Sequence, residues 1–102
     1  MFPQSVSYGK NYLEKFRKHA EQIRRTTGRK EIGKVSSVEG QEQIKAVIAE
    51  IVMLGETRQQ RYMAIPDALW SKLGDAIVIR QAEGEFVTFL EAEKGAAIAW
   101  EK

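Results

Sequence analysis

The chain has 102 residues, no cysteine, one histidine and a formal net charge of +2. The absence of cysteine excludes a disulfide-stapled chain, and the length is sufficient for a core without disulfides. The content of 43% hydrophobic and 29% charged residues is that of an ordinary folded domain and argues against a largely disordered chain. We therefore expect a single domain over residues 1–102, with residues 1–7 as a loose lead-in.

The apolar runs are too short for a membrane protein. Runs such as Ile51–Leu54 and Ala96–Trp100 have at most five residues, whereas a membrane span needs about 20 apolar residues. No basic segment followed by an apolar one marks a signal peptide near the start. These features predict a cytoplasmic protein that does not enter a membrane.

The charges are divided unevenly along the chain. Residues 1–34 carry nine Lys and Arg against three acidic residues, a surplus of +6. Residues 35–102 carry seven Lys and Arg against eleven acidic residues, a net charge of −4. The basic first part fits an anionic partner, and it fits equally well a contact between the two parts of the chain.

The first predicted element is a long amphipathic helix from Tyr8 to Thr27, with Ser7 as its cap and Gly28 as its end. Its apolar residues recur at helical spacing on one face, and these are Tyr8, Tyr12, Leu13, Phe16, Ala20 and Ile23. The opposite face is basic and carries Lys10, Lys15, Arg17, Lys18, Arg24 and Arg25.

This basic face has two interpretations. It is a solvated surface with weak Glu14–Lys18 and Glu21–Arg25 pairs, or it is a helix that contacts phosphates, extended by Arg29 and Lys30.

Two elements are predicted in the middle of the chain. Lys34–Val38 is predicted as a short strand, and Gln41–Leu54 as a helix because its apolar residues form a helical stripe. Many of these residues are β-branched, so a buried strand is the alternative for this segment. In that case Gly55–Thr57 would be a turn and Gln60–Ile65 would pair back on it.

The last part is predicted as strand, helix, strand, strand. Residues 58–65 form the first strand, and a short helix at about 66–73 begins at Pro66 and ends before Gly74. Residues 76–80 and 85–90 form a hairpin, with Gly84 in its turn. Both strands are apolar on both faces, which predicts that helices or a second subunit cover them and favours a homodimer. Residues 96–100 are predicted as a final strand.

No catalytic or metal-binding pattern is present. His19 lies at the edge of the apolar stripe, where a packing role is the expected one, and Trp70 and Trp100 are expected in the core. The chain has no nucleophile elbow, no glycine-rich phosphate loop and no carboxylate spacing that suggests a metal site. We expect no enzyme, no cofactor and no metal, with a small toxin-like ribonuclease as the remaining enzymatic alternative.

Residues 58–91 resemble the AbrB/MazE swapped-hairpin family. The resemblance is carried by Arg61–Pro66, Ala68–Asp75, Ala76–Arg80, Gly84 and Phe86–Leu90. Members of that family have a strand ending in Ile-Pro, a short helix ending in Leu-Gly, and a strand–turn–strand.

The resemblance implies a dimer that binds DNA through basic residues in and before the first strand. The matching positions here are Arg58 and Arg61.

Two functional hypotheses follow. The first is a small nucleic-acid-binding regulatory protein of α+β fold, whose long N-terminal helix packs on a small antiparallel sheet. Its phosphate-contacting residues would be Lys15, Lys18, Arg24, Arg25, Arg29, Lys30, Arg58 and Arg61. The second is a protein-interaction module without enzymatic activity, such as an adaptor, inhibitor or assembly factor.

Overall fold

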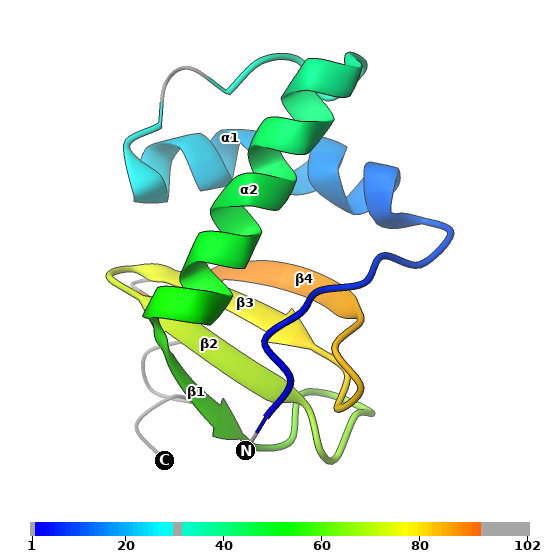
Figure 1. Cartoon of the computed structure of the whole chain (residues 1–102), viewed down its shortest axis with the longest axis vertical. Helices are drawn as coiled ribbons and strands as arrows, with labels where there is room; N and C mark the ends of the chain where they lie inside the picture. Colours follow the sequence, from blue (N-terminus) through cyan, green and yellow to red (C-terminus); the bar gives the residue numbers. More distant parts are fainter. Residues whose placement is uncertain (1, 30–31, 93–102) are drawn as a thin grey trace.

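Two helices lie against one face of a four-stranded antiparallel sheet, which confirms the predicted α+β class (Figure 1). The computed structural model describes residues 2–29 and 32–92. The elements are α1 (Tyr12–Thr27), α2 (Val38–Leu54), β1 (Glu56–Gln59), β2 (Leu69–Leu73), β3 (Ala76–Arg80) and β4 (Phe86–Glu91). The strands follow one another across the sheet in chain order, so β1 and β4 are its edges.

Helix α1 is shorter than predicted, because the chain before it is paired with the sheet. It begins at Tyr12 instead of Tyr8, and Asn11 rather than Ser7 precedes it. The Ser7 backbone is occupied elsewhere, since its N–H donates to Gly84 O at 3.2 Å and its carbonyl accepts from Phe86 N at 2.8 Å. The predicted end at Gly28 is confirmed, with φ at 69°.

Helix α2 confirms the helical interpretation of residues 41–54 and extends it toward the N-terminus. The Ser37 side chain accepts a hydrogen bond from Gly40 N at 3.0 Å and so caps the helix. The predicted strand at 34–38 is therefore wrong. Ser37, placed in that strand, is the cap that starts α2.

The predicted helix at 66–73 is also wrong, because Leu69–Leu73 form the inner strand β2. This strand pairs with β1 on one side and with β3 on the other, so its backbone is satisfied by neighbours distant in sequence. Gly74, at φ 63°, is the first residue of the two-residue β2–β3 turn rather than a helix end. Pro66 lies in the loop that precedes β2.

The predicted strand at 58–65 is only partly correct. Its first two residues belong to β1, which runs from Glu56 to Gln59. Residues 60–68 form a loop, in which Tyr62 and Ile65 exchange two backbone hydrogen bonds of 2.9 Å. The predicted hairpin of residues 76–80 and 85–90 is confirmed as β3 and β4. The strand predicted at 96–100 and Trp100 lie outside the described residues.

The sheet is buried on both faces, and different parts of the chain cover each face. The helices pack on one face over a core that includes Phe16, Ile48, Val78 and Phe89. On the other face Trp70, Ile77 and Ile79 form a second cluster, together with Ala68 and Ala92. Tyr62 and Ile65 of the loop before β2 pack against this cluster, so the chain itself supplies cover that we expected from a helix or a second subunit. The homodimer stays a prediction.

Trp70 is buried, as expected, and its indole Nε1 donates to Gln60 O at 3.1 Å. Among the described helices, none is long and apolar enough to cross a membrane.

Four aromatic rings join the start of α1 to the sheet. Phe16 lies 5.7 Å from Tyr8, 5.3 Å from Tyr12 and 5.8 Å from Phe86, measured between ring centroids. The Lys45 ammonium of α2 lies 5.0 Å from the Tyr8 ring centroid and 4.8 Å from that of Tyr12. Burial raises the pKa of the Tyr8 hydroxyl above its usual range, and the negative charge of Glu42 raises it further.

This shift predicts a loss of stability at high pH. The unfolded chain releases the Tyr8 proton above a pH of about 10, while the folded protein still holds it. The stabilisation is thus complete below a pH of about 10 and decreases as the pH rises through the raised pKa. The free energy of unfolding should therefore fall progressively as the pH rises above about 10.

Urea denaturation between a pH of about 8 and about 11 measures this loss, and Tyr8→Phe is the comparison because it cannot ionise. The variant should lose less stability than the wild type over that range. Identical pH profiles for the two proteins would contradict the burial of an ionisable Tyr8 hydroxyl.

Candidate nucleic-acid interface

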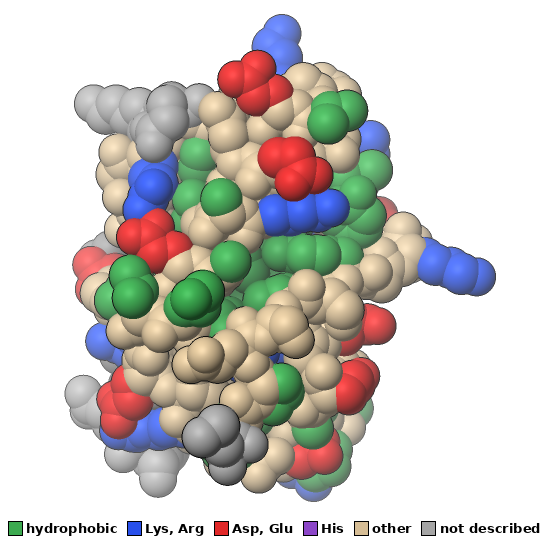
Figure 2. All heavy atoms as spheres, viewed as in Figure 1, with side chains coloured by type: hydrophobic (Ala, Val, Ile, Leu, Met, Phe, Trp, Pro, Cys, Tyr) green, Lys and Arg blue, Asp and Glu red, His purple; other side chains and the backbone are tan. Residues whose placement is uncertain are grey.

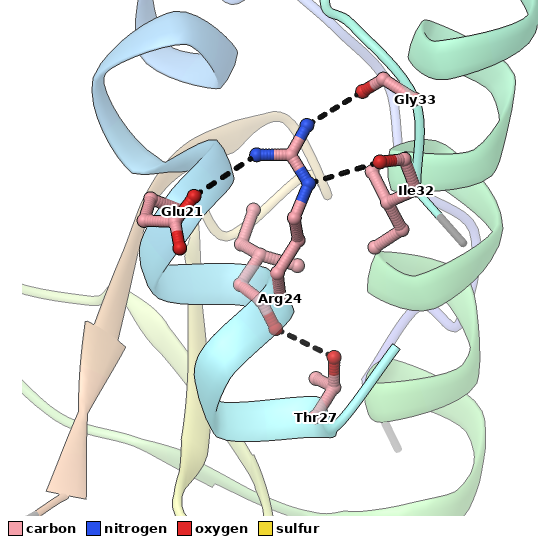
Figure 3. A network of polar contacts seen from close by, with 6 residues as sticks. Glu21, Arg24, Thr27, Ile32 and Gly33 are labelled. Carbon is pink, nitrogen blue, oxygen red and sulfur yellow. Dashed lines mark hydrogen bonds and ion pairs between the residues drawn. The ribbon is translucent and has the colours of Figure 1, made fainter. Parts of the chain in front are cut away.

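Arg24, a predicted phosphate-binding residue, forms hydrogen bonds within the protein (Figure 3). Its Nε donates to Ile32 O at 2.9 Å and its Nη2 donates to Gly33 O at 2.7 Å. Its Nη1 contacts the Glu21 carboxylate at 3.3 Å. The side chain therefore ties the segment between the two helices to α1, and only a quarter of its surface is exposed.

The next two arginines have acidic partners from distant elements. Arg25 forms an ion pair with Glu91 of β4, whose side chain is 3% exposed, and Arg29 forms one with Glu50 of α2. The expected Glu21–Arg25 pair is replaced by these contacts, since Glu21 faces Arg24. Lys30 lies outside the described residues.

The cations of the first half of α1, and Lys10 two residues before the helix, differ from these arginines. Lys10, Lys15, Arg17 and Lys18 are exposed, and none of them has an ion pair with a described residue. The expected Glu14–Lys18 pair is not formed within residues 2–29 and 32–92. The excess positive charge of this helix is thus concentrated toward its N-terminus.

Lys15 and Lys18 lie on one wall of a groove with a volume of about 450 Å³. His19 belongs to the same wall, and residues 62–65 of the loop before β2 form the opposite wall. The floor consists of Val87, Thr88 and Leu90 of β4. The fold thus places two of the predicted phosphate-binding lysines opposite the loop that follows Arg61.

The groove joins charge to apolar and aromatic surface. Met63 is 78% exposed, and its backbone has a positive φ of 51°. Tyr62 is held edge-on against Trp70, with ring centroids 5.8 Å apart. A groove with lysines on one side and an aromatic ring on the other can contact a phosphate chain and its bases together.

The two arginines of the predicted first strand lie at different places. Arg61 is exposed beside the groove wall, and its Nη1 donates to Met63 O at 3.2 Å. Arg58 lies on β1, the edge of the sheet opposite β4, and its Nη2 is 3.7 Å from the Glu56 carboxylate. The structure therefore places Arg61 next to the loop that lines the groove, whereas Arg58 lies on the opposite edge of the sheet.

His19 is a hydrogen-bonded packing residue, as expected. Its Nδ1 lies 2.8 Å from Gln22 Oε1, and its Nε2 lies 3.1 Å from Thr88 Oγ1. Both ring nitrogens are thus occupied by neighbours. The sequence gives no sign that His19 borders a groove, because the opposite wall comes from residues more than forty positions away.

Positive and negative charges are mixed on the face of the molecule that carries α2. Figure 2 shows basic and acidic side chains interspersed over the face that carries α2, with no large area of one sign. Within the part of the chain that the structure describes, no three His, Asp or Glu side chains form a group that could hold a metal ion.

Comparisons with protein-family models, with curated proteins and with solved structures find no match to this chain. The resemblance of residues 58–91 to the AbrB/MazE family accordingly stays a prediction.

Proposed function

We propose that this protein is a small nucleic-acid-binding regulatory protein that contacts phosphates through the N-terminal half of α1. The observation that supports the proposal is the division of charge along the basic face. Arg24, Arg25 and Arg29 are satisfied within the protein, whereas Lys15 and Lys18 are exposed without acidic partners among the described residues. Exposed cations beside a groove attract an anionic polymer and can contact its phosphates.

The groove between α1 and residues 62–65 is the proposed path of the strand. Lys15 and Lys18 would contact phosphates from one wall, and Arg61 from beyond the other. Tyr62 and Met63 offer apolar surface for a base. Binding of this kind depends mainly on charge and reads sequence weakly.

The test is the salt dependence of binding to labelled duplex and single-stranded DNA, followed by fluorescence anisotropy. With about four phosphate contacts, the logarithm of the affinity should fall with the logarithm of the salt concentration with a slope of about −3 to −4. Lys15→Gln/Lys18→Gln should weaken binding about tenfold or more at low salt and make the slope shallower by about 2.

The matched control is Lys34→Gln/Lys72→Gln, which removes the same two charges away from the groove. It should leave most of the affinity intact. Equal losses in the two double variants would mean that net charge alone drives binding. Absence of binding to either probe at low salt would overturn the proposal and leave the protein-interaction hypothesis.

A further inference from the structure

Arg80 is a buried cation to which the described part of the protein gives no anion. It ends β3 on the face that the helices cover, and its side chain is 0% exposed. Its Nη1 donates to Pro3 O at 2.7 Å and to Ser5 O at 3.0 Å. Its Nε is buried and has no hydrogen-bond partner, and no described carboxylate forms an ion pair with it. Burial lowers the pKa of the guanidinium from its usual value.

This arrangement contrasts with the arginines of and after α1 that form ion pairs. Arg24, Arg25 and Arg29 are less buried than Arg80, and each has a glutamate partner. An ionised group in a low-dielectric interior is strongly destabilising unless an anion and hydrogen bonds compensate it. Two backbone carbonyls supply partial compensation for Arg80, and its Nε has no acceptor among the described residues.

A pocket of about 290 Å³ lies against Arg80. Its walls come from the N-terminal segment, the end of α2 and β1, and they include Phe2, Pro3, Val52, Met53 and Thr57. Figure 1 shows the N-terminal segment (dark blue) running across the sheet beside α2 before it enters α1. The pocket thus combines one cation, the Thr57 hydroxyl and the Gln4 amide with apolar side chains, and its size is close to the lower end of the range for small-molecule sites.

Exposed apolar side chains border the pocket. Met53 is 61% exposed and Phe2 is 36% exposed, and both are pocket residues. Figure 2 shows hydrophobic side chains at the surface where the lower end of α2 meets the sheet. Exposed apolar side chains around a buried cation fit an amphiphilic anion rather than an inorganic one.

We propose that this pocket binds a small monocarboxylic acid with an apolar body, held by Arg80 and Thr57. The planar guanidinium matches a carboxylate in geometry and charge. The Thr57 hydroxyl, 2.8 Å from Ser71 Oγ, donates a second hydrogen bond while it accepts one from Ser71. Val52, Met53 and Phe2 cover the apolar body. A single carboxylate balances the single cation, whereas a phosphate would bring excess negative charge to a site with one basic group.

The first experiment is an NMR titration of the whole protein with hexanoate, with hexanol and inorganic phosphate as comparison probes. Hexanoate should shift the backbone amides of Gly55 and Thr57, and neither comparison probe should do so at the same concentration. Equal shifts with hexanol would mean an apolar contact without an anion site and would overturn the proposal. Shifts spread over the surface lysines instead of the pocket would also overturn it.

The second experiment uses variants of the two polar groups. Arg80→Lys keeps the charge and loses the planar fork, and Thr57→Val keeps the shape and loses the hydroxyl. We expect each to weaken hexanoate binding about tenfold or more, the effect of losing a hydrogen bond to a charged group. Should Arg80→Lys fail to fold, Thr57→Val alone decides, and unchanged affinity in that variant overturns the proposal.

Lys15→Gln/Lys18→Gln serves as the matched control. It alters the groove beside α1 and none of the residues around Arg80. Hexanoate should bind this double variant as it binds the wild type, so the carboxylate site and the proposed nucleic-acid function are tested separately. A parallel loss of hexanoate binding would contradict a separate site at Arg80.

Discussion

Replacement of Phe16 by Ala is expected to lower the free energy of unfolding by about 3–5 kcal/mol, the usual cost of removing a buried aromatic side chain. Phe16 is 0% exposed and lies among three rings, those of Tyr8, Tyr12 and Phe86. The substitution would remove the side chain that links α1 to the N-terminal segment and to β4. Because domains of this size are stable by only about 5–15 kcal/mol, the loss is a large fraction of the total.

Thermal denaturation followed by circular dichroism measures the effect, and the midpoint should fall by about 10 °C or more. The matched control is Leu54→Ala, a comparable truncation at the end of α2, where the side chain is 67% exposed. The control should change the free energy of unfolding by no more than about 0.5 kcal/mol. Similar effects of the two substitutions would contradict the packing of α1 on the sheet.

Replacement of Gly40 by Ala should destabilise the protein, although the general rule for helices predicts the opposite. Alanine is favoured over glycine within a helix by about 1 kcal/mol. A Cβ atom at Gly40, however, would lie 2.0 Å from Lys34 O and 2.8 Å from the Lys34 carbonyl carbon. Since backbone atoms cause the clash, the helix and the preceding segment would have to separate. We expect a net loss of about 2–3 kcal/mol in the free energy of unfolding.

Gly33→Ala is the matched control, because it adds the same methyl group to the other side of the same contact. There the added Cβ would lie 3.5 Å from Gln43 Oε1 and 3.8 Å from the Gly40 Cα, at ordinary contact distances. Chemical denaturation should show an effect below about 1 kcal/mol for this variant. A stabilising effect of Gly40→Ala would show that the approach of residues 33–34 to α2 is looser than the structure describes.

Local signals in the sequence determined the helices and the last hairpin. The apolar stripes at helical spacing lie on the buried faces of α1 and α2, and Gly28 ends α1 as predicted. The strands at 76–80 and 85–90 followed from two short apolar runs around Gly84. Each of these signals depends on neighbours within a few residues. The start of α1 was not predicted correctly, because the Ser7 backbone pairs with Gly84 and Phe86, which are distant in sequence.

The segment 66–73 could not be assigned in this way. Pro66 and Gly74 together resemble the start and the end of a helix, and this local pattern predicts one. The same Gly74-Asp75 pair also fits a two-residue hairpin turn, which is what the structure contains. The choice is made by β1 and β3, which both pair with β2 and supply more backbone hydrogen bonds than one short helix could.

For the candidate site too, the sequence determined some features and the tertiary structure determined others. The sequence by itself determined that α1 is amphipathic and that five of the sixteen Lys and Arg residues cluster on it, since this follows from the order of side chains alone. It could not show that Arg25 and Arg29 are paired while the lysines of α1 are exposed. These two arginines form ion pairs with Glu91 and Glu50, which lie 66 and 21 positions further along the chain. Only the folded chain decides which cations have internal anions, and so which charges remain available to a partner.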